Sequence, residues 1–482
     1  MNNGDITPLV PELFMALIAM GFLLVGVVQG NRATSVLSWA ACATMLITAS
    51  LTMNVGWETR TILDGMLVFD EFSAVMKLIV LLGMVFSLAL SVQYIYLERI
   101  ARFEYPVLVM LAGVGMMLML SANNMLSLYM SLELQSLSLY VLAAFHRNSL
   151  RSAEAASKYF ILGALSSGML LFGISLIYGF TGSLDFYVIR DSLSGLSKIP
   201  PGFTVGMVFV LAAIAFKISA VPFHMWTPDV YQGSPTSVTA LFAIVPKVAA
   251  LGLLTRLLFV PFSPAILQWT QILYFLALAS MVLGAFAGIA QSNIKRLFAY
   301  SSIGNMGYVL IALVAGNAQG VGAMMVFMVI YVFMTAGVFA IVLHMRRGGL
   351  AVERIDDLAG MSSYSPVLAY AMAVLMFSMS GIPPLAGFFG KFFVFQAAVA
   401  QGYYILAVLG IVASVVAAYY YLRIIKVMFF SEPADAFDVG MGLGARTVLL
   451  ISLAFTLLFI AKPAMLYDPI LSAAGSLFAV AG

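Results

Sequence analysis

Apolar runs long enough to cross a lipid bilayer recur along almost the whole of this sequence. A transmembrane helix needs about 20 predominantly apolar residues, and a window of about 19 residues finds fourteen such runs. Only 9% of the residues are charged and 63% are hydrophobic, whereas a water-soluble domain carries about 25% charged residues. We therefore expect an all-α polytopic membrane protein.

The predicted spans are separated by short polar segments. The fourth and fifth are divided only by Ser121 to Asn123, and an even number of spans places both chain ends on one side of the membrane. No Lys or Arg precedes Arg32, so the basic region of a cleaved signal peptide is missing and the first run is expected to remain as a helix. The spans cover residues 9–29, 36–55, 72–95, 106–121, 124–145, 153–180, 203–231, 235–259, 266–289, 295–315, 319–345, 364–400, 403–429 and 446–467.

The loops on the two sides of the membrane differ in basic residues. Loops after odd-numbered spans hold thirteen of the 23 Lys and Arg residues. The positive-inside rule then places both termini on the non-cytoplasmic, periplasmic side of a bacterial inner membrane, with an organelle as the open alternative. The net charge of +3 is spread over many loops, so nucleic acid is not expected as a partner. The opposite loops hold Arg60, Arg190, Lys198, Arg256 and Lys462.

Two long spans contain similar proline motifs. Phe216–Pro222 (FKISAVP) and Phe377–Pro383 (FSMSGIP) share Phe, Ser, a small residue and Pro at the same offsets. A proline removes a helical hydrogen bond, so the motifs predict discontinuous helices 7 and 12, unless the prolines only kink ordinary helices. Five spans per unit make the repeats inverted. One membrane domain, 1–482, would then comprise helices 1–3 (1–105), two five-helix repeats (106–259 and 260–430) and helix 14 (431–482).

We single out six charged residues inside the predicted spans. A charge at bilayer depth costs on the order of 2.5–3.5 kcal/mol on insertion scales, so these residues are functional candidates. The two that lie closest to a membrane surface could instead have a structural role. Lys158 could extend to the membrane surface, and Lys77 could do the same or pair with Glu71. The remaining four lie near mid-membrane: Glu133, Lys217, Lys247 and Lys391.

Buried lysines suggest a path for protons. Burial disfavours the charged form of an amine, so a buried lysine can release and regain a proton near neutral pH, and a nearby carboxylate restores the charge. Moving Glu133 relative to Lys217 would then load or discharge the lysine. His224 follows Pro222 in the predicted break and could join relay waters or bond freed carbonyls. The alternative is a scaffold whose lysines are only salt-bridged.

Several chemistries are not indicated by this sequence. Cys42 is the only cysteine, so neither an internal disulfide nor a four-cysteine iron–sulfur or zinc site is expected within the chain. We find no phosphate-binding glycine loop, no dinucleotide fingerprint and no metal-ligand spacing. The chain is expected to hold no cofactor and no metal of its own.

Three segments resemble a known family. They are Phe216–Leu241 (FKISAVPFHMWTPDVYQGSPTSVTAL), Asn293–Tyr308 (NIKRLFAYSSIGNMGY) and Ser380–Phe393 (SGIPPLAGFFGKFF). They are similar to the proton-translocating, antiporter-like membrane subunits of respiratory complex I and of cation/proton antiporters, and the similarity extends over most of the chain. Asn305 departs from the His often found there in related subunits.

The resemblance implies a role for each candidate. Glu133 matches the glutamate of helix 5, Lys217 its partner in helix 7, Lys247 the central lysine of helix 8 and Lys391 the lysine of helix 12, while Lys158 would modulate Lys217. The chain would be a translocase subunit of NADH:quinone oxidoreductase, beside another antiporter-like subunit and small membrane subunits, in contact with lipid and protons. NADH, FMN, iron–sulfur clusters and quinone would belong to partner subunits. The alternative is a subunit of a multi-chain cation/proton antiporter.

Overall fold

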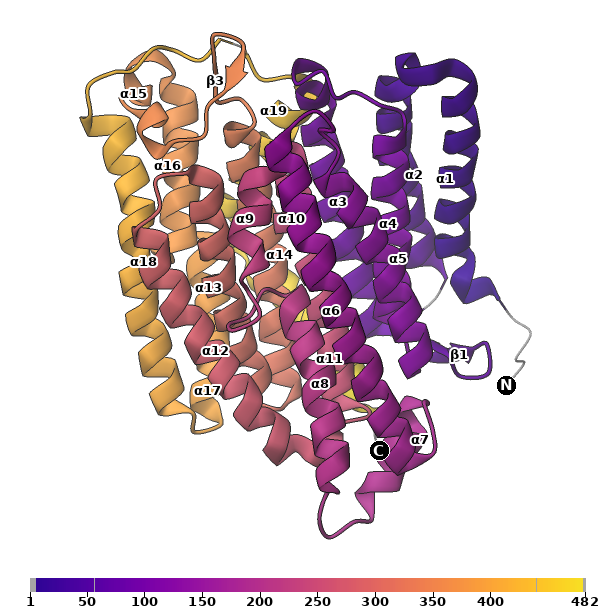
Figure 1. Cartoon of the computed structure of the whole chain (residues 1–482). Coiled ribbons are helices and arrows are strands. Elements are labelled where there is room, and N and C mark those ends of the chain that lie inside the picture. Colours follow the sequence, from indigo (N-terminus) through magenta and orange to yellow (C-terminus); the bar gives the residue numbers. More distant parts are fainter. Residues whose placement is uncertain (1–5, 56, 439, 480–482) are drawn as a thin grey trace.

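The protein is a bundle of long helices that lie side by side (Figure 1). The computed structural model describes residues 6–55, 57–438 and 440–479. The long helices of the first half are α1 (Val10–Gln29), α2 (Thr34–Asn54), α3 (Glu71–Leu97), α4 (Glu104–Ser121), α5 (Met125–Ala143), α6 (Leu150–Thr181), α8 (Pro201–Lys217), α9 (Trp226–Gly233), α10 (Thr236–Ile244) and α11 (Pro246–Phe259). Those of the second half are α12 (Ile266–Ile289), α13 (Ile294–Val314), α14 (Ala318–Val342), α16 (Pro366–Ser380), α17 (Ala386–Ala400), α18 (Tyr404–Phe430), α19 (Leu443–Leu458) and α20 (Ala464–Ala479).

The helices account for the fourteen predicted spans. In the described residues, eleven apolar helical stretches are long enough to cross a membrane, and the first of them, Thr7–Asn54, contains both α1 and α2. The two remaining spans are built from shorter helices, α8 with α9 and α16 with α17. The all-α polytopic membrane fold predicted from the sequence is confirmed.

Helices 7 and 12 are discontinuous, as the proline motifs predicted. Between α8 and α9 the chain turns at Ser219, whose φ is 63°, and between α16 and α17 it turns at Gly381, whose φ is 86°. These angles lie in the left-handed region, which ends a helix. At the end of α8 the Phe216 carbonyl accepts from the Ser219 backbone N–H at 3.1 Å and from the Trp226 indole N–H at 2.9 Å.

Helix 8 is also interrupted, which the sequence interpretation did not anticipate. We expected one continuous span at 235–259, but α10 ends at Ile244 and α11 begins at Pro246. The residue between them, Val245, has φ −110° and ψ −53°. Pro246 has no N–H to donate to the preceding turn and is tolerated only at the start of a helix. Lys247 is therefore in the first turn of a new half-helix.

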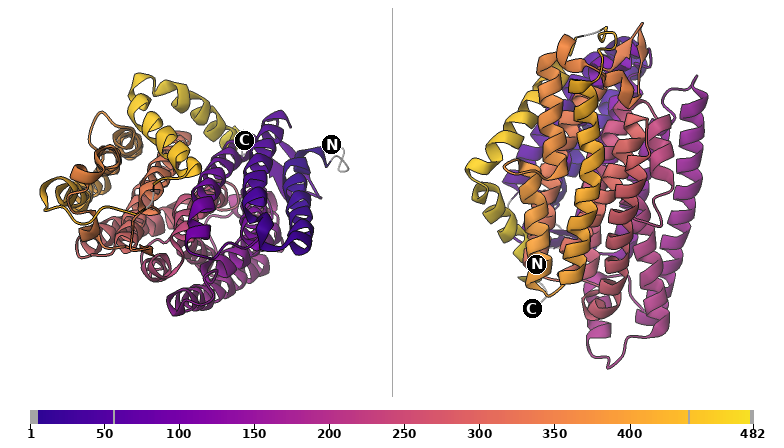
Figure 2. Two further views of the ribbon diagram at one scale, coloured as in Figure 1. Left: turned by 90° about the horizontal axis from the view of Figure 1, so that it is seen from above. Right: turned by 90° about the vertical axis from the view of Figure 1, so that its left-hand side faces the viewer.

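The two halves of the bundle share a packing plan. α4 packs on α5 and on α11, while α12 packs on α13 and on α18. The first two helices of each predicted repeat approach closely at glycines: a Cβ on Gly115 would lie 2.6 Å from the backbone nitrogen of Gln135, and one on Gly284 would lie 2.6 Å from that of Gly304. Seen from above, the two halves lie beside each other (Figure 2). This packing supports two repeats; their bounds, 106–259 and 260–430, stay a prediction.

Short elements close both ends of the bundle. The described strands form two antiparallel hairpins, β1 (Arg60–Ile62) with β2 (Leu67–Phe69) and β3 (Arg346–Arg347) with β4 (Leu350–Ala351). A short helix, α7 (Phe186–Ser194), lies between α6 and α8, and α15 (Met361–Tyr364) precedes α16. Beyond the last predicted span, α20 packs on α3 and α14. The sequence analysis missed α20 because its apolar run is shorter than a span and contains Pro469.

A buried charge cluster joins α1, α3 and α11. Lys77 pairs with Glu12 at 2.6 Å, both side chains being at most 3% exposed, so the suggested partner Glu71 is wrong. Arg256, which we counted as a loop residue, is in α11 and donates two hydrogen bonds of 2.9 Å to Asp70. Asp70 also caps α3 by accepting from the Ser73 amide at 2.7 Å. Asp70 therefore both pairs with Arg256 and begins α3.

Candidate functional site

Three buried lysines in the bundle lack a carboxylate partner. Lys217, Lys247 and Lys391 are 6%, 1% and 7% exposed. Their amino groups bond to hydroxyls and backbone carbonyls, and within the described residues no ion pair joins any of them to an Asp or Glu. Of the other lysines inside helices, Lys77, Lys158 and Lys295 are ion-paired, and Lys426 of α18 is exposed. The three unpaired lysines therefore form a distinct set.

Lys217 is the last residue of α8, at the break in helix 7. Its amino group donates to the Ser136 hydroxyl at 2.8 Å and to the Tyr140 hydroxyl at 3.4 Å, both on α5. The second half of α8, Val210 to Phe216, is buried, so Lys217 lies in the core of the bundle. The lysine is thus held between two helices rather than on either surface.

Glu133 lies one helical turn before Ser136 on α5. Its carboxylate accepts a hydrogen bond from the Ser167 hydroxyl of α6. Glu133 is half-buried and is not in direct contact with Lys217, since Ser136 takes the position next to the amino group. Residues three apart face the same side of a helix, so a small movement of α5 or the Lys217 side chain changes their separation.

Lys247 is held by the second half of the bundle. It donates to the Ser302 hydroxyl of α13, and that hydroxyl is hydrogen-bonded to the Tyr331 hydroxyl of α14 at 2.7 Å. Its amino group also lies 5.3 Å from the centre of the Tyr231 ring. Lys247 of α11 is therefore bonded to α13, which lies in the predicted second repeat.

Lys391 uses the break in helix 12. Its amino group donates to the carbonyls of Met379 at 3.1 Å and Ser380 at 3.0 Å, at the end of α16, and to the Ser414 hydroxyl of α18 at 2.8 Å. The last carbonyls of a helix lack intrahelical partners. The break in helix 12 therefore supplies two of the three hydrogen-bond acceptors of Lys391.

One helix, α13, contacts both Lys247 and Lys391. Ser302 bonds Lys247, and the Tyr308 ring lies 5.1 Å from the Lys391 amino group. Between them, the Asn305 amide donates to the Ser301 hydroxyl at 3.5 Å, and Ser301 bonds Tyr421 at 2.6 Å. Hydroxyl and amide groups thus line the interval between the two lysines. The sequence interpretation singled out only Asn305 among them.

Lys158 occupies a different environment. Its side chain is 43% exposed and forms ion pairs of 2.9 Å with Glu154 and with Asp229, and Asp229 also pairs with Arg296 at 2.6 Å. The neighbouring Tyr159 stacks on Trp226 at 4.5 Å, between this network and the interior. A half-exposed ion pair contributes little free energy.

Replacing Lys158 by glutamine should lower coupled activity modestly and leave assembly intact. Because an exposed ion pair contributes about 1 kcal/mol or less, we expect a change of roughly fivefold at most in any step that the lysine tunes. The activity to measure is proton transfer in membranes, normalised to the amount of this chain. Complete loss of activity at a normal amount of protein would contradict a modulating role for Lys158. It would mean that Lys158 is as necessary as the buried lysines.

His224 lies in the break between α8 and α9. It is half-buried, and its Nδ1 atom is buried without a hydrogen-bond partner among the described residues. Trp226 bonds the Phe216 carbonyl at 2.9 Å and Thr227 the Ser219 hydroxyl at 2.7 Å, while the His224 ring interacts with the Pro222 backbone carbonyl. The relay role of His224 stays a prediction.

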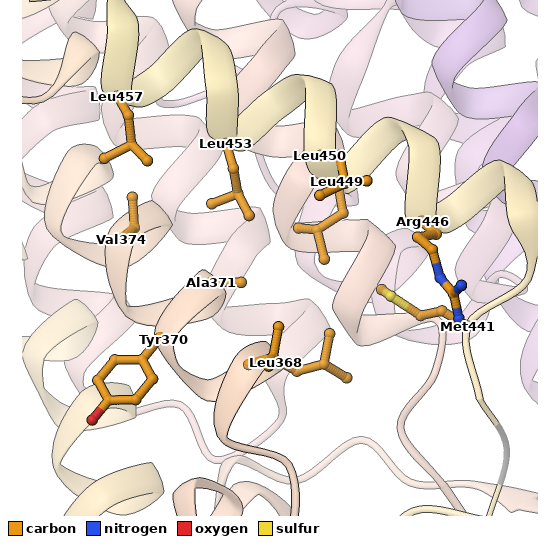
Figure 3. A pocket seen from close by; sticks show the side chains of 11 residues that line it. Leu368, Tyr370, Ala371, Val374, Met441, Arg446, Leu449, Leu450, Leu453 and Leu457 are labelled. Atoms are coloured by element: carbon orange, nitrogen blue, oxygen red, sulfur yellow. The ribbon is translucent and has the colours of Figure 1, made fainter.

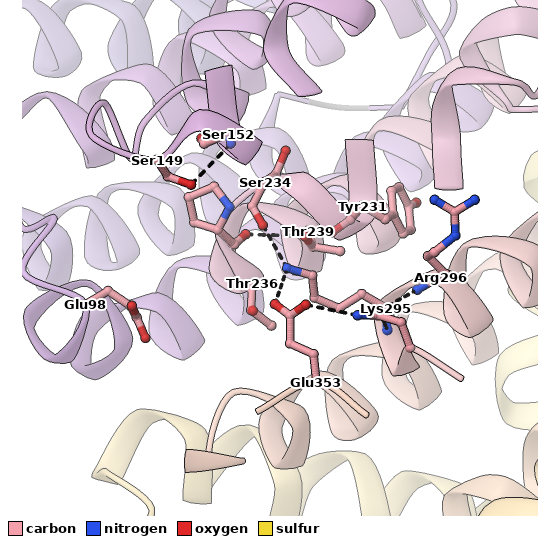
Figure 4. A network of polar contacts seen from close by, with 12 residues as sticks. Glu98, Ser149, Ser152, Tyr231, Ser234, Thr236, Thr239, Lys295, Arg296 and Glu353 are labelled. Carbon is pink, nitrogen blue, oxygen red and sulfur yellow. Dashed lines mark hydrogen bonds and ion pairs between the residues drawn. The ribbon is translucent and has the colours of Figure 1, made fainter. Parts of the chain in front are cut away.

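Lys295 is a buried lysine that the sequence interpretation missed. We placed it in a loop, but it is in the first turn of α13 and only 2% exposed. Figure 4 shows it between Ser234 and Glu353: it donates to the Ser234 carbonyl at 2.9 Å and pairs with Glu353 at 2.7 Å. Lys295 lies two residues after Asn293, which caps α13. The sequence interpretation assigned it to a loop because basic residues are common beside the ends of spans.

The fold and the lysines together define a class of protein. Discontinuous transmembrane helices with ionisable side chains at the interruptions are the arrangement of ion-translocating membrane proteins. Within the described residues no group of three His, Cys, Asp or Glu side chains could hold a metal ion. The site is built from lysine amines, hydroxyls, backbone carbonyls and the Glu133 carboxylate.

Comparison with known proteins gives the family. A family model described as "NADH:quinone oxidoreductase/Mrp antiporter, TM" matches residues 122–417. The chain belongs to this family, which confirms the resemblance found in its sequence. It is 48% identical over 482 residues to the NADH-quinone oxidoreductase subunit N of Paramagnetospirillum magneticum, with 99% of each chain covered.

Solved structures share the fold. A chain of respiratory complex I from Thermus thermophilus with bound aureothin superposes with a TM-score of 0.81 at 32% identity, covering 95% of this chain and 98% of that one. A chain of the Mrp complex from Dietzia superposes with a TM-score of 0.84 at 22% identity, covering 98% of both. At that identity the second similarity concerns the fold alone.

Proposed function

We propose that this chain is a proton-translocating membrane-arm subunit of NADH:quinone oxidoreductase, of the subunit N type, driven by quinone reduction in other subunits. One observation carries the proposal: Lys217, Lys247 and Lys391 are buried among hydroxyls and carbonyls and have no ion-pair partner in the described residues. A hydroxyl accepts from an ammonium and donates to a neutral amine. Such a site serves both protonation states, as a proton carrier requires.

The geometry suggests an order of transfer. Glu133 and Lys217 form the loading pair; Ser136, one turn from Glu133 on α5, accepts from the lysine at 2.8 Å and donates to the Leu132 carbonyl at 2.6 Å. Lys247 is the bridge between the repeats through Ser302 and Tyr331. Lys391 is the outlet, with His224 as an additional relay group near the first break. Protons move from the cytoplasmic to the outer face in this scheme.

Placement in the membrane and partners follow from the same proposal. The chain is a multi-pass protein of a bacterial inner membrane, with both termini on the periplasmic side, as the distribution of Lys and Arg indicates. Its neighbours are another antiporter-like subunit and small membrane subunits. NADH, FMN, the iron–sulfur clusters and the quinone are held by partner subunits, and this chain carries no redox centre.

The subunit N assignment is supported by the named relatives and by one residue, Lys391. The curated relatives at 48% and 53% identity are both named NADH-quinone oxidoreductase subunit N. Lys391 stands where a glutamate is expected in the sister subunit M. The alternative, a subunit of a cation/proton antiporter complex, matches the fold of the Mrp chain, at 22% identity.

Lys217→Ala tests the proposal directly. We expect assembly to be retained while proton pumping and coupled NADH:quinone turnover collapse, because the variant removes the amine that faces Glu133 through Ser136. The measurement pairs NADH oxidation with proton uptake in membrane vesicles, and a native gel reports assembly. The matched control is Lys198→Ala, which removes an exposed lysine from the loop between α7 and α8.

The outcomes separate the candidate functions. Loss of assembly in Lys217→Ala, with normal pumping per assembled complex, would support a scaffold. Unchanged NADH oxidation and pumping would exclude the relay role of Lys217 and make cation exchange by an antiporter complex the next assay.

A further inference from the structure

An apolar groove runs along the surface of the bundle between α16 and α19 (Figure 3). Its volume is about 520 Å³. Figure 3 shows Ala371 and Val374 of α16 facing Leu453 and Leu457 of α19 across it. The groove is remote from Lys217, Lys247 and Lys391, none of which lines it. It is therefore a feature that the proton path does not explain.

The groove has the length of one lipid leaflet. The α19 residues that line it extend from Arg446 to Leu457, which at 1.5 Å per residue is about 16 Å. Half of a bilayer core of about 30 Å is about 15 Å. Both α16 and α19 begin at the end of the groove that holds Arg446, so its apolar part extends from a membrane surface towards the midplane.

The lining of the groove suits a hydrocarbon chain with a charged headgroup. Apart from Tyr370 and Arg446, the residues that line it are apolar. A single extended acyl chain is thin enough to lie along such a surface. The one charged side chain of the lining, Arg446, favours an occupant that carries an anionic group at that end.

A free positive charge marks the surface end of the groove. Arg446 is exposed, and its guanidinium has no hydrogen-bond or ion-pair partner in the part of the chain that the structure describes. The nearby loop carboxylate of Asp438 is engaged elsewhere, since it accepts from the Gly349 amide at 2.8 Å.

We propose that this groove binds an anionic phospholipid. One acyl chain lies between α16 and α19, and the phosphate lies against Arg446. A guanidinium matches phosphate oxygens with two parallel N–H donors. Leu449, Leu453 and Val374 contact the chain.

Charge discriminates between headgroups in this site. A basic residue near an anionic membrane surface contributes about 1 kcal/mol, which corresponds to about fivefold in occupancy. A zwitterionic phospholipid, whose own ammonium offsets the phosphate, gains less from Arg446. The groove is therefore expected to prefer phosphatidylglycerol to phosphatidylcholine of the same acyl chains.

Photo-labelling in native membranes tests the proposal. Phosphatidylglycerol and phosphatidylcholine, each with a diazirine in one acyl chain, are added to membranes that contain the assembled complex, and labelled peptides of this chain are identified by mass spectrometry. We expect the phosphatidylglycerol probe to label α16 and the segment Leu449–Leu457 about fivefold more than the phosphatidylcholine probe. Arg446→Gln should reduce the first signal to the level of the second.

A second variant and two controls complete the test. Val374→Trp fills the groove and should reduce labelling by both probes, with a native gel confirming assembly. Arg32→Gln removes an exposed arginine that does not line the groove and should change nothing. Leu165, 63% exposed on α6, reports ordinary lipid contact and should be labelled equally by both probes.

Two results would overturn the proposal. Equal labelling by both probes in the groove, at the level seen on α6 and unaffected by Arg446→Gln, would mean ordinary lipid contact without a site. Cross-links from groove residues to a peptide of another subunit, in place of lipid, would mean that the groove belongs to a protein interface.

Discussion

Lys247→Met should abolish proton pumping without loss of the assembled protein. Methionine is apolar and similar in length, and Ser302 and Tyr331 remain hydrogen-bonded to each other at 2.7 Å, so no buried polar group is left unpaired. We expect pumping per assembled complex to fall roughly 10²-fold, the low end of what removing a positioned proton-transfer group costs. Dye quenching in inverted vesicles, normalised to the chain on a native gel, measures the effect.

Lys247→Arg separates proton exchange from fixed charge. Arginine keeps the positive charge but is not deprotonated in proteins, so a pathway that passes a proton through this position should stop in both variants. Normal pumping by Lys247→Arg would show that a permanent cation is sufficient at the bridge between the repeats. Lys198→Met, in an exposed loop, is the matched control for loss of a lysine.

Asp70→Asn should strongly destabilise the folded protein. Asparagine can still cap α3, but the Arg256 guanidinium, 1% exposed, would lose its carboxylate. Removing one partner of a buried ion pair costs about 3–5 kcal/mol. We expect less intact complex after heating of solubilised membranes, measured on a native gel across a temperature series.

The double variant Asp70→Asn with Arg256→Met should recover much of that loss. Replacing both members of a buried pair removes the unpaired charge, and such replacements are often close to neutral. Glu71→Gln, at the next residue and outside both buried pairs, serves as the control. Equal damage from Asp70→Asn and the double variant would mean that α3 needs the carboxylate for another reason.

The sequence predicted the spans and the breaks because both depend on local properties. Apolar runs of span length locate the helices, and a charge within such a run, as at Lys217 or Lys391, is identified by its neighbours in the chain. Proline motifs located the breaks in helices 7 and 12. Pro246 carries the same signal for helix 8, but it lies where an otherwise continuous apolar run, 235–259, outweighed it.

The partners of the charged residues could not be predicted from the sequence. Lys77 pairs with Glu12 on α1, 65 positions earlier, and Lys247 bonds Ser302, 55 positions later. Such contacts depend on how each helix is rotated in the bundle, which a single sequence does not specify. Serine hydroxyls at Ser136, Ser302 and Ser414 carried no distinguishing pattern, and Lys295 resembled an ordinary residue at the end of a span.

The two contacts of α13 restrict how this segment can change in length during evolution. Ser302, which bonds Lys247, and Tyr308, whose ring lies beside Lys391, are on one rigid helix. An α-helix turns about 100° per residue, so one residue inserted or deleted between them would turn one contact away from its lysine. Within the stretch, Gly307 is restricted separately, because an added Cβ would lie 2.8 Å from the Ala277 carbonyl oxygen of α12. The two lysines therefore restrict the length of this stretch, and the packing against α12 restricts its composition.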